Sequence, residues 1–88
     1  MDMRFDKVYL LKAEHNSLNR IKQLCEDYNI KDNGCFENAA PFHFAWGFGP
    51  DGLIYISPST FASRKPDFNS IEELVEFLDS KSDHRNEA

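Results

Sequence analysis

The chain has 88 residues, of which 41% are hydrophobic and 14% aromatic, and its 10 basic and 15 acidic residues give a formal net charge of -5. This length predicts one domain near the lower limit of what a single apolar core can stabilise, and the acidic balance argues against a nucleic-acid surface, which normally shows a basic patch. Two cysteines without metal-ligand spacing, and no apolar run long enough for a signal peptide or membrane span, predict a cytoplasmic protein without metal or cofactor.

The first predicted element is a strand over residues 7–12, in which Val8 and Leu10 alternate with Tyr9 and Leu11. Both faces of this strand are apolar, whereas a half-buried strand would alternate apolar and polar side chains. We therefore expect neighbours on both faces, or a second face that meets a partner.

Apolar residues recur at helical spacing over residues 16–28, which predicts an amphipathic helix that ends in the turn residues 31–34. Cys25 falls on the apolar face, where we expect a small core hydrophobe, because nothing local would lower the pKa of its thiol. Residues 35–41 are too short and mixed for a regular element, so we expect a loop.

Residues 42–59 predict a β-hairpin, because two alternating apolar runs flank the turn residues 50–52. Pairing of Gly49 with Leu53 sets the register and so decides which side chains share a face. The core face would carry Phe44, Trp46, Phe48, Ile54 and Ile56. The opposite face would carry His43, Ala45, Gly47, Leu53, Tyr55 and Ser57. The glycines match the letters G-x-G-x-x-G, but a dinucleotide site needs a strand followed by a helix, and here two strands flank them.

A second helix is predicted from Ser70, because Ser70 and Glu73 have the spacing of a capping box and an apolar stripe follows at helical spacing. Residues 60–68 are expected to form a loop. The compact domain then spans residues 1–80, and residues 81–88, which lack an apolar anchor, form a disordered tail. The outer face of this helix carries the acidic residues Glu72, Glu76 and Asp79.

The element order is β-α-β-β-α, which predicts an α+β domain. A right-handed crossover would set the first two strands parallel with the third between them, in a split βαβ unit of strand order 1-3-2 with both helices on one face. The other face would stay open as an apolar patch able to make hydrogen bonds, and we expect it to be the working surface. This open face would carry Tyr9, Leu11, His43 and Tyr55.

The order of elements resembles an RNA-recognition motif that lacks its fourth strand. That resemblance covers most of the chain in the order of elements but not in sequence, and it implies base stacking on Tyr9 and Tyr55 by position. Single-stranded nucleic-acid binding through the open face is therefore one alternative function, which the net charge disfavours.

The favoured interpretation is a small non-enzymatic protein-binding module: an inhibitor, adaptor or regulatory subunit. Modules of this kind are often encoded by phages or other mobile elements and act against a host or defence protein. Its partner would be another protein with a basic surface, contacted by Tyr9, Leu11, His43, Tyr55, Glu72, Glu76 and Asp79. Unpaired strand edges could also receive a partner's strand, and homodimerisation fits the same features. A second alternative is a small enzyme that uses Cys35 and His43 as a thiol and imidazole pair.

Overall fold

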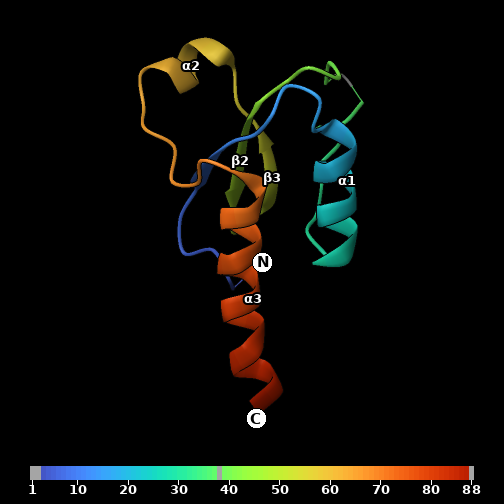
Figure 1. Cartoon of the computed structure of the whole chain (residues 1–88), viewed down its shortest axis with the longest axis vertical. Helices are drawn as coiled ribbons and strands as arrows, with labels where there is room; N and C mark the ends of the chain where they lie inside the picture. The colour runs from blue at the N-terminus through green and yellow to red at the C-terminus, as the bar shows by residue number, and fades with distance from the viewer. Residues whose placement is uncertain (1–2, 38, 88) are drawn as a thin grey trace.

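The structure, a computed structural model, describes residues 3–37 and 39–87, except for the side chains of residues 82–87. It is an α+β fold built on a three-stranded antiparallel sheet (Figure 1), with an additional short helix where the sequence predicts a loop. The elements in chain order are β1 (Tyr9–Lys12), α1 (Leu18–Asp27), β2 (Ala45–Gly49), β3 (Gly52–Tyr55), α2 (Pro58–Ala62) and α3 (Ile71–Glu87).

The strand order is β1-β2-β3, and both neighbouring pairs are antiparallel. The predicted order 1-3-2, with the first two strands parallel, is therefore wrong. A long connection after α1 leads the chain back to the end of the sheet at which β1 stops. There the amide of Ala13 donates to the carbonyl oxygen of Phe44 at 2.8 Å, so β2 starts beside the end of β1 and runs against it.

The hairpin register differs from the prediction by one residue, because Gly49 pairs with Gly52 instead of Leu53. Gly52 has a φ of 107° and joins the strand, so the turn consists of two residues instead of three. A shift of one residue turns every β3 side chain to the other face of the sheet. Trp46 consequently pairs with Tyr55, and the predicted core position of Ile54 is wrong.

One sheet face, which we call the helix-covered face, packs against both α1 and α3. The prediction that Val8 and Leu10 point to the helices while Tyr9 and Leu11 stay open is wrong, because Leu11 is fully buried in the main core. Both faces of this strand are apolar, so its sequence contains no alternation of apolar and polar residues that could decide which face turns toward the helices. The side chains of this face are Tyr9, Leu11, Trp46, Phe48, Leu53 and Tyr55.

The opposite face, which we call the second sheet face, is flatter because its middle strand contributes two glycines. A Cβ on Gly47 would lie 3.1 Å from Ile56, and a Cβ on Gly49 would lie 3.0 Å from Val8, so neighbouring apolar side chains fill both positions. The helix α2 covers one end of this face through Phe61. The side chains of this face are Val8, Leu10, Lys12, Ala45, Ile54 and Ile56.

Both outer strands make backbone hydrogen bonds to other segments of the chain along their free edges. Along β1, the amide of Lys12 donates to the Phe68 carbonyl oxygen at 2.9 Å, and the amide of Phe68 donates to the Leu10 carbonyl oxygen at 3.0 Å. Along β3, the amide of Leu53 donates to the Lys31 carbonyl oxygen at 2.8 Å. The expectation of unpaired edges for a partner's strand is therefore wrong at these positions.

The last helix begins as the sequence predicts, because the Ser70 hydroxyl accepts a hydrogen bond from the Glu73 amide at 3.2 Å. The Glu73 carboxylate in turn accepts from the amide of Asn69 at 3.1 Å. The backbone continues as helix through Glu87, without a break at the predicted domain boundary. Disorder of residues 81–88 stays a prediction, because most of their side chains lie outside the described residues.

Candidate functional site

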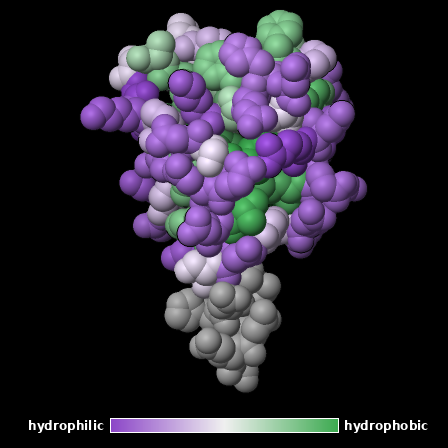
Figure 2. Space-filling view, in the orientation of Figure 1, coloured by the Kyte–Doolittle hydropathy of each residue, from purple (hydrophilic) through white to green (hydrophobic). Residues whose placement is uncertain are grey.

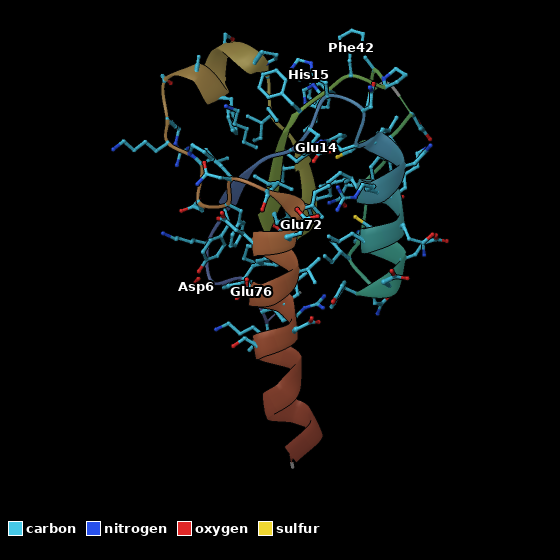
Figure 3. The ribbon with its side chains drawn as sticks, in the orientation of Figure 1. Asp6, Glu14, His15, Phe42, Glu72 and Glu76 are labelled. Atoms are coloured by element: carbon cyan, nitrogen blue, oxygen red, sulfur yellow. The ribbon has the colours of Figure 1, made fainter. Side chains whose placement is uncertain are left out.

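Four large apolar side chains are exposed among the described residues: Met3 (88%), Val8 (37%), Phe42 (65%) and Tyr55 (44%). Phe42 and Tyr55 belong to the same end of the sheet, where β2 begins and β3 ends. Phe42 lies at the extreme of the molecule in Figure 3. We call the group of Phe42, His43 and Tyr55, with Phe44 and Trp46 beneath it, the aromatic end.

His43 is the buried residue that connects the aromatic rings of the aromatic end. Its side chain is buried, and its Nε2 donates to the carbonyl oxygen of Ala45, which can only accept and so defines the tautomer of this bond. The imidazole stacks on the Tyr55 ring, with 4.1 Å between centroids and 15° between planes. It also makes a perpendicular contact with Trp46, with centroids 4.9 Å apart. Tyr55 therefore has one face fixed and the other directed outward.

Phe44 connects the aromatic end to two other segments. Its ring stacks on the exposed His15, which precedes α1, with centroids 5.5 Å apart. It also meets Phe61 of α2 edge-on, with centroids 5.8 Å apart. Figure 3 shows His15 and Phe42 at this same end of the molecule. Aromatic contacts from three segments thus determine the shape of the aromatic end.

Two of the predicted partner-binding residues, Tyr9 and Leu11, do not lie on an open surface. The Tyr9 hydroxyl donates to Asp6, which raises the pKa of Tyr9 and lowers that of Asp6, and the ring packs against Phe68 and Phe77. Leu11 is part of the main core. Because α1 and α3 cover this face, Tyr9 and Tyr55 do not form the exposed stacking pair that the resemblance to an RNA-recognition motif implies.

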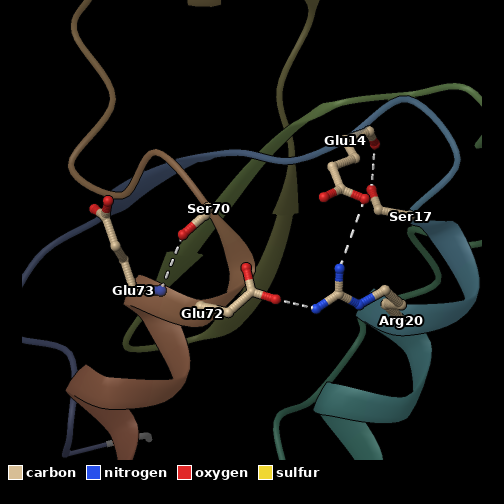
Figure 4. Close-up of polar contacts among 6 residues, drawn as sticks. All are labelled: Glu14, Ser17, Arg20, Ser70, Glu72 and Glu73. Atoms are coloured by element: carbon tan, nitrogen blue, oxygen red, sulfur yellow. Dashed lines mark hydrogen bonds and ion pairs between the residues drawn. The ribbon is translucent and has the colours of Figure 1, made fainter.

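The predicted acidic residues of α3 turn partly toward α1. Glu72 accepts a charge-assisted hydrogen bond from Arg20, which lowers the pKa of the carboxyl group, and Arg20 also lies 3.7 Å from Glu14 (Figure 4). Asp79 accepts from the hydroxyl of Tyr28. Both acidic side chains remain exposed, as does Glu76 between them. A role for these three residues in partner binding stays a prediction.

The two helices leave apolar surface visible between them. Figure 2 shows this strip framed by hydrophilic residues. Leu18 of α1 and Val75 of α3 are partly buried against the main core. Arg20 and Tyr28 each donate a hydrogen bond to an acidic side chain of α3 and so link the two helices. We assign the strip a structural role, because its residues continue directly into the core.

The cysteines and the buried imidazole make separate contacts. The Cys35 thiol donates to the Leu53 carbonyl oxygen at 3.4 Å, and burial raises the pKa of this thiol. Burial raises the pKa of Cys25 to about 12. Both thiols are therefore protonated at neutral pH, whereas nucleophilic catalysis needs a thiolate. Among the described contacts His43 bonds to Ala45 and Cys35 to Leu53, so the thiol and imidazole pair is not formed.

Two further observations bear on the predicted absence of a metal site and of a membrane span. The described residues contain no group of three histidine, cysteine or acidic side chains that could hold a metal ion. Within the same part of the chain, no helix has both the length and the apolar character needed to cross a membrane.

Phe42 is the site residue that sequence reasoning missed. It falls in phase with Phe44, Trp46 and Phe48, so the alternation places it on the core face of a strand. In the structure it belongs to the turn that contains Pro41, outside the strand, and the alternation no longer applies. The proline was the available signal, because it fixes φ and commonly stands at the second position of a turn.

Comparisons of the chain with protein-family models, with curated proteins and with solved structures found no match.

Proposed function

We propose that this chain is a non-enzymatic protein-binding module, an inhibitor, adaptor or regulatory subunit, that contacts its partner through the aromatic end. The observation that carries the proposal is the exposure of Phe42 and Tyr55 at one end of the sheet, where Tyr55 stacks on the buried His43. Aromatic side chains dominate the residues that contribute most to binding at protein interfaces, and exposed apolar groups of this kind mark interaction sites.

The rigidity of the aromatic end supports the same proposal. The Tyr55 ring is already stacked on His43, and His43 is held by its bond to Ala45 and by Trp46. Binding would therefore immobilise few side chains, whereas each flexible side chain that becomes ordered costs about 0.5–1.5 kcal/mol. Full burial of an aromatic or large aliphatic side chain contributes roughly 1.5–3 kcal/mol. Because Phe42 is 65% and Tyr55 44% exposed, their further burial would together contribute roughly 1.5–3 kcal/mol. A micromolar complex needs roughly 8 kcal/mol.

The net charge of -5 favours a partner with a basic surface. Charges on the rim of an interface mainly raise the association rate and select against partners of like charge. The exposed acidic side chains of α3, including Glu76, lie away from the aromatic end (Figure 3) and would act at long range. We therefore expect association to slow with added salt, while the lifetime of the complex depends on the aromatic contacts.

The test uses a photo-crosslinking phenylalanine derivative at position 42, with a second variant that carries it at Met3 as the control. Met3 is more exposed than Phe42. We expect a discrete adduct with one protein from the native host at position 42 and none at position 3. Equal adducts at both positions would show non-specific binding, and no adduct at position 42 would contradict the proposal.

A companion measurement quantifies the affinity for the crosslinked protein. The double variant Phe42→Ala/Tyr55→Ala should bind on the order of 30-fold more weakly, since two interface aromatics contribute about 2 kcal/mol together. Met3→Ala should bind as the wild type does. Light scattering on the purified chain shows whether a second copy is the partner, in which case Phe42 crosslinks to the chain itself.

A further inference from the structure

The helix α2 is attached to the rest of the molecule differently from α1 and α3. Figure 1 shows it apart from the other helices, joined by one connection from β3 and a long one toward α3. Among its five residues Phe61 is buried, and the residues around it are exposed. Its segment is bounded by Pro58 and Pro66, which limit the backbone conformations at both ends.

The hydrogen bonds of this segment are made within the segment. Ser57 accepts from the amide of Thr60 at 3.3 Å, the amide of Phe61 donates to the Ser57 carbonyl oxygen at 3.0 Å, and the amide of Arg64 donates to the Phe61 carbonyl oxygen at 3.1 Å. Over residues 57–64, none of the described hydrogen bonds reaches the sheet. The chain is fastened again at Asp67, whose amide and carboxylate both bond to Leu10.

The surface beneath α2 is a separate small core. Phe61 packs on Leu10 and Ala45, which are buried, and on the partly buried Phe44 and Ile56. This cluster does not merge with the main core on the helix-covered face, because the sheet lies between them. Removal of α2 would expose the cluster and extend the apolar surface that Val8 already presents on the same face.

We propose that residues 57–66 form a lid on the second sheet face, with Phe61 as its latch, and that the lid opens without unfolding of the main core. A segment with one buried side chain and only local hydrogen bonds belongs to the least stable part of a protein. Opening of the lid exposes the apolar cluster of Leu10, Ala45 and Ile56, and closing covers it again. The proposal does not depend on the function of the aromatic end.

Amide hydrogen exchange by NMR on the full chain tests the lid. The amides of Phe61 and Arg64 report on the lid, and those of Trp46 and Phe48 report on the central strand. We expect lid protection on the order of 10- to 100-fold, from the burial of one phenylalanine. The strand amides should be protected at least about 10³-fold, because they exchange only through global unfolding. Equal protection of the lid and strand amides would overturn the proposal.

The variant Phe61→Ala tests the latch. We expect the amide of Arg64 to lose its protection. The strand amides should lose no more than the same 10- to 100-fold, because the lid opens before global unfolding and the free energy lost at Phe61 enters both steps only once. Phe61→Leu should restore part of the lid protection, and it also serves if Phe61→Ala fails to fold. Ala62→Ser, at an exposed neighbouring position, should change neither. Unchanged lid protection in both Phe61 variants would show that another contact closes the segment.

Discussion

The position of Gly52 makes the most specific prediction about the fold. Its φ of 107° lies in a region that residues with side chains rarely adopt, and a Cβ there would collide with the carbonyl oxygen of Lys31. That same oxygen accepts the hydrogen bond from Leu53 that covers the outer edge of β3. Gly52→Ala should therefore strain the hairpin and displace the segment that protects the strand edge.

The expected loss of stability has two parts. Holding a residue with a side chain in an unfavourable backbone conformation costs about 1–3 kcal/mol. Displacing Lys31 disrupts one backbone hydrogen bond, which contributes about 1 kcal/mol. The sum of about 2–4 kcal/mol is a large fraction of the roughly 5–15 kcal/mol that stabilises a typical domain.

Urea unfolding followed by fluorescence measures this loss directly, because Trp46 is the single tryptophan and is fully buried. Gly34→Ala is the matched control, since Gly34 also has a positive φ, of 76°, but a Cβ there would meet nothing within 4 Å. It should lose only the part due to backbone conformation. If Gly52→Ala destabilises the chain no more than Gly34→Ala does, the close approach of Lys31 is not a constraint.

Three further perturbations test individual side chains. His43→Leu removes both the bond to Ala45 and the stack on Tyr55, and should lower the free energy of unfolding by about 1–3 kcal/mol in urea titrations; an unchanged midpoint would contradict a structural role for His43. Burial raises the pKa of Cys25 from 9.0 to about 12, so the folded state prefers the neutral thiol. Stability should therefore fall by about 1.4 kcal/mol per pH unit above pH 9, less steeply in Cys25→Ala, and equal slopes would argue against burial as the cause. The pKa of Glu72 is lowered from 4.5 by Arg20, so this pair stabilises the fold above pH 4.5 and is lost as the pH falls through the lower folded value. Glu72→Gln should flatten the acid limb of a stability profile measured at low salt, and an unaltered limb would show that the exposed pair contributes nothing measurable.

The candidate site divides into parts that local sequence could and could not predict. His43 and Tyr55 were both predicted to lie on one face of the hairpin and to take part in binding, and the structure stacks one on the other. Tyr9 and Leu11 share the sheet face of Tyr55, as predicted, but that face was expected to stay open and is instead covered by α1 and α3. That error came from β1, whose two apolar faces are equivalent in sequence and are distinguished only by what packs on each.

Contacts between distant segments were the least predictable. Phe5 lies in a stretch without helical or strand periodicity, yet it is buried and stacks on Phe77 of α3 with centroids 5.7 Å apart. Phe61 was assigned to a loop and instead forms a separate core with Leu10. Neither residue differs locally from an exposed apolar residue, because its burial depends on contacts with other segments of the chain.

The sequence by itself determined the class of the fold, the presence of the amphipathic helix α1 and the start of α3. Helical periodicity and capping depend on residues only a few positions apart. It also determined that a hairpin lies within residues 42–59. Only the tertiary structure decided the strand order, the register and the buried face of β1. The Ala13 bond to Phe44 places β2 against β1, and the conformation of Gly52 beside Lys31 sets which β3 side chains meet the helices. These choices arise from packing between segments far apart in the chain, for which local patterns carry no information.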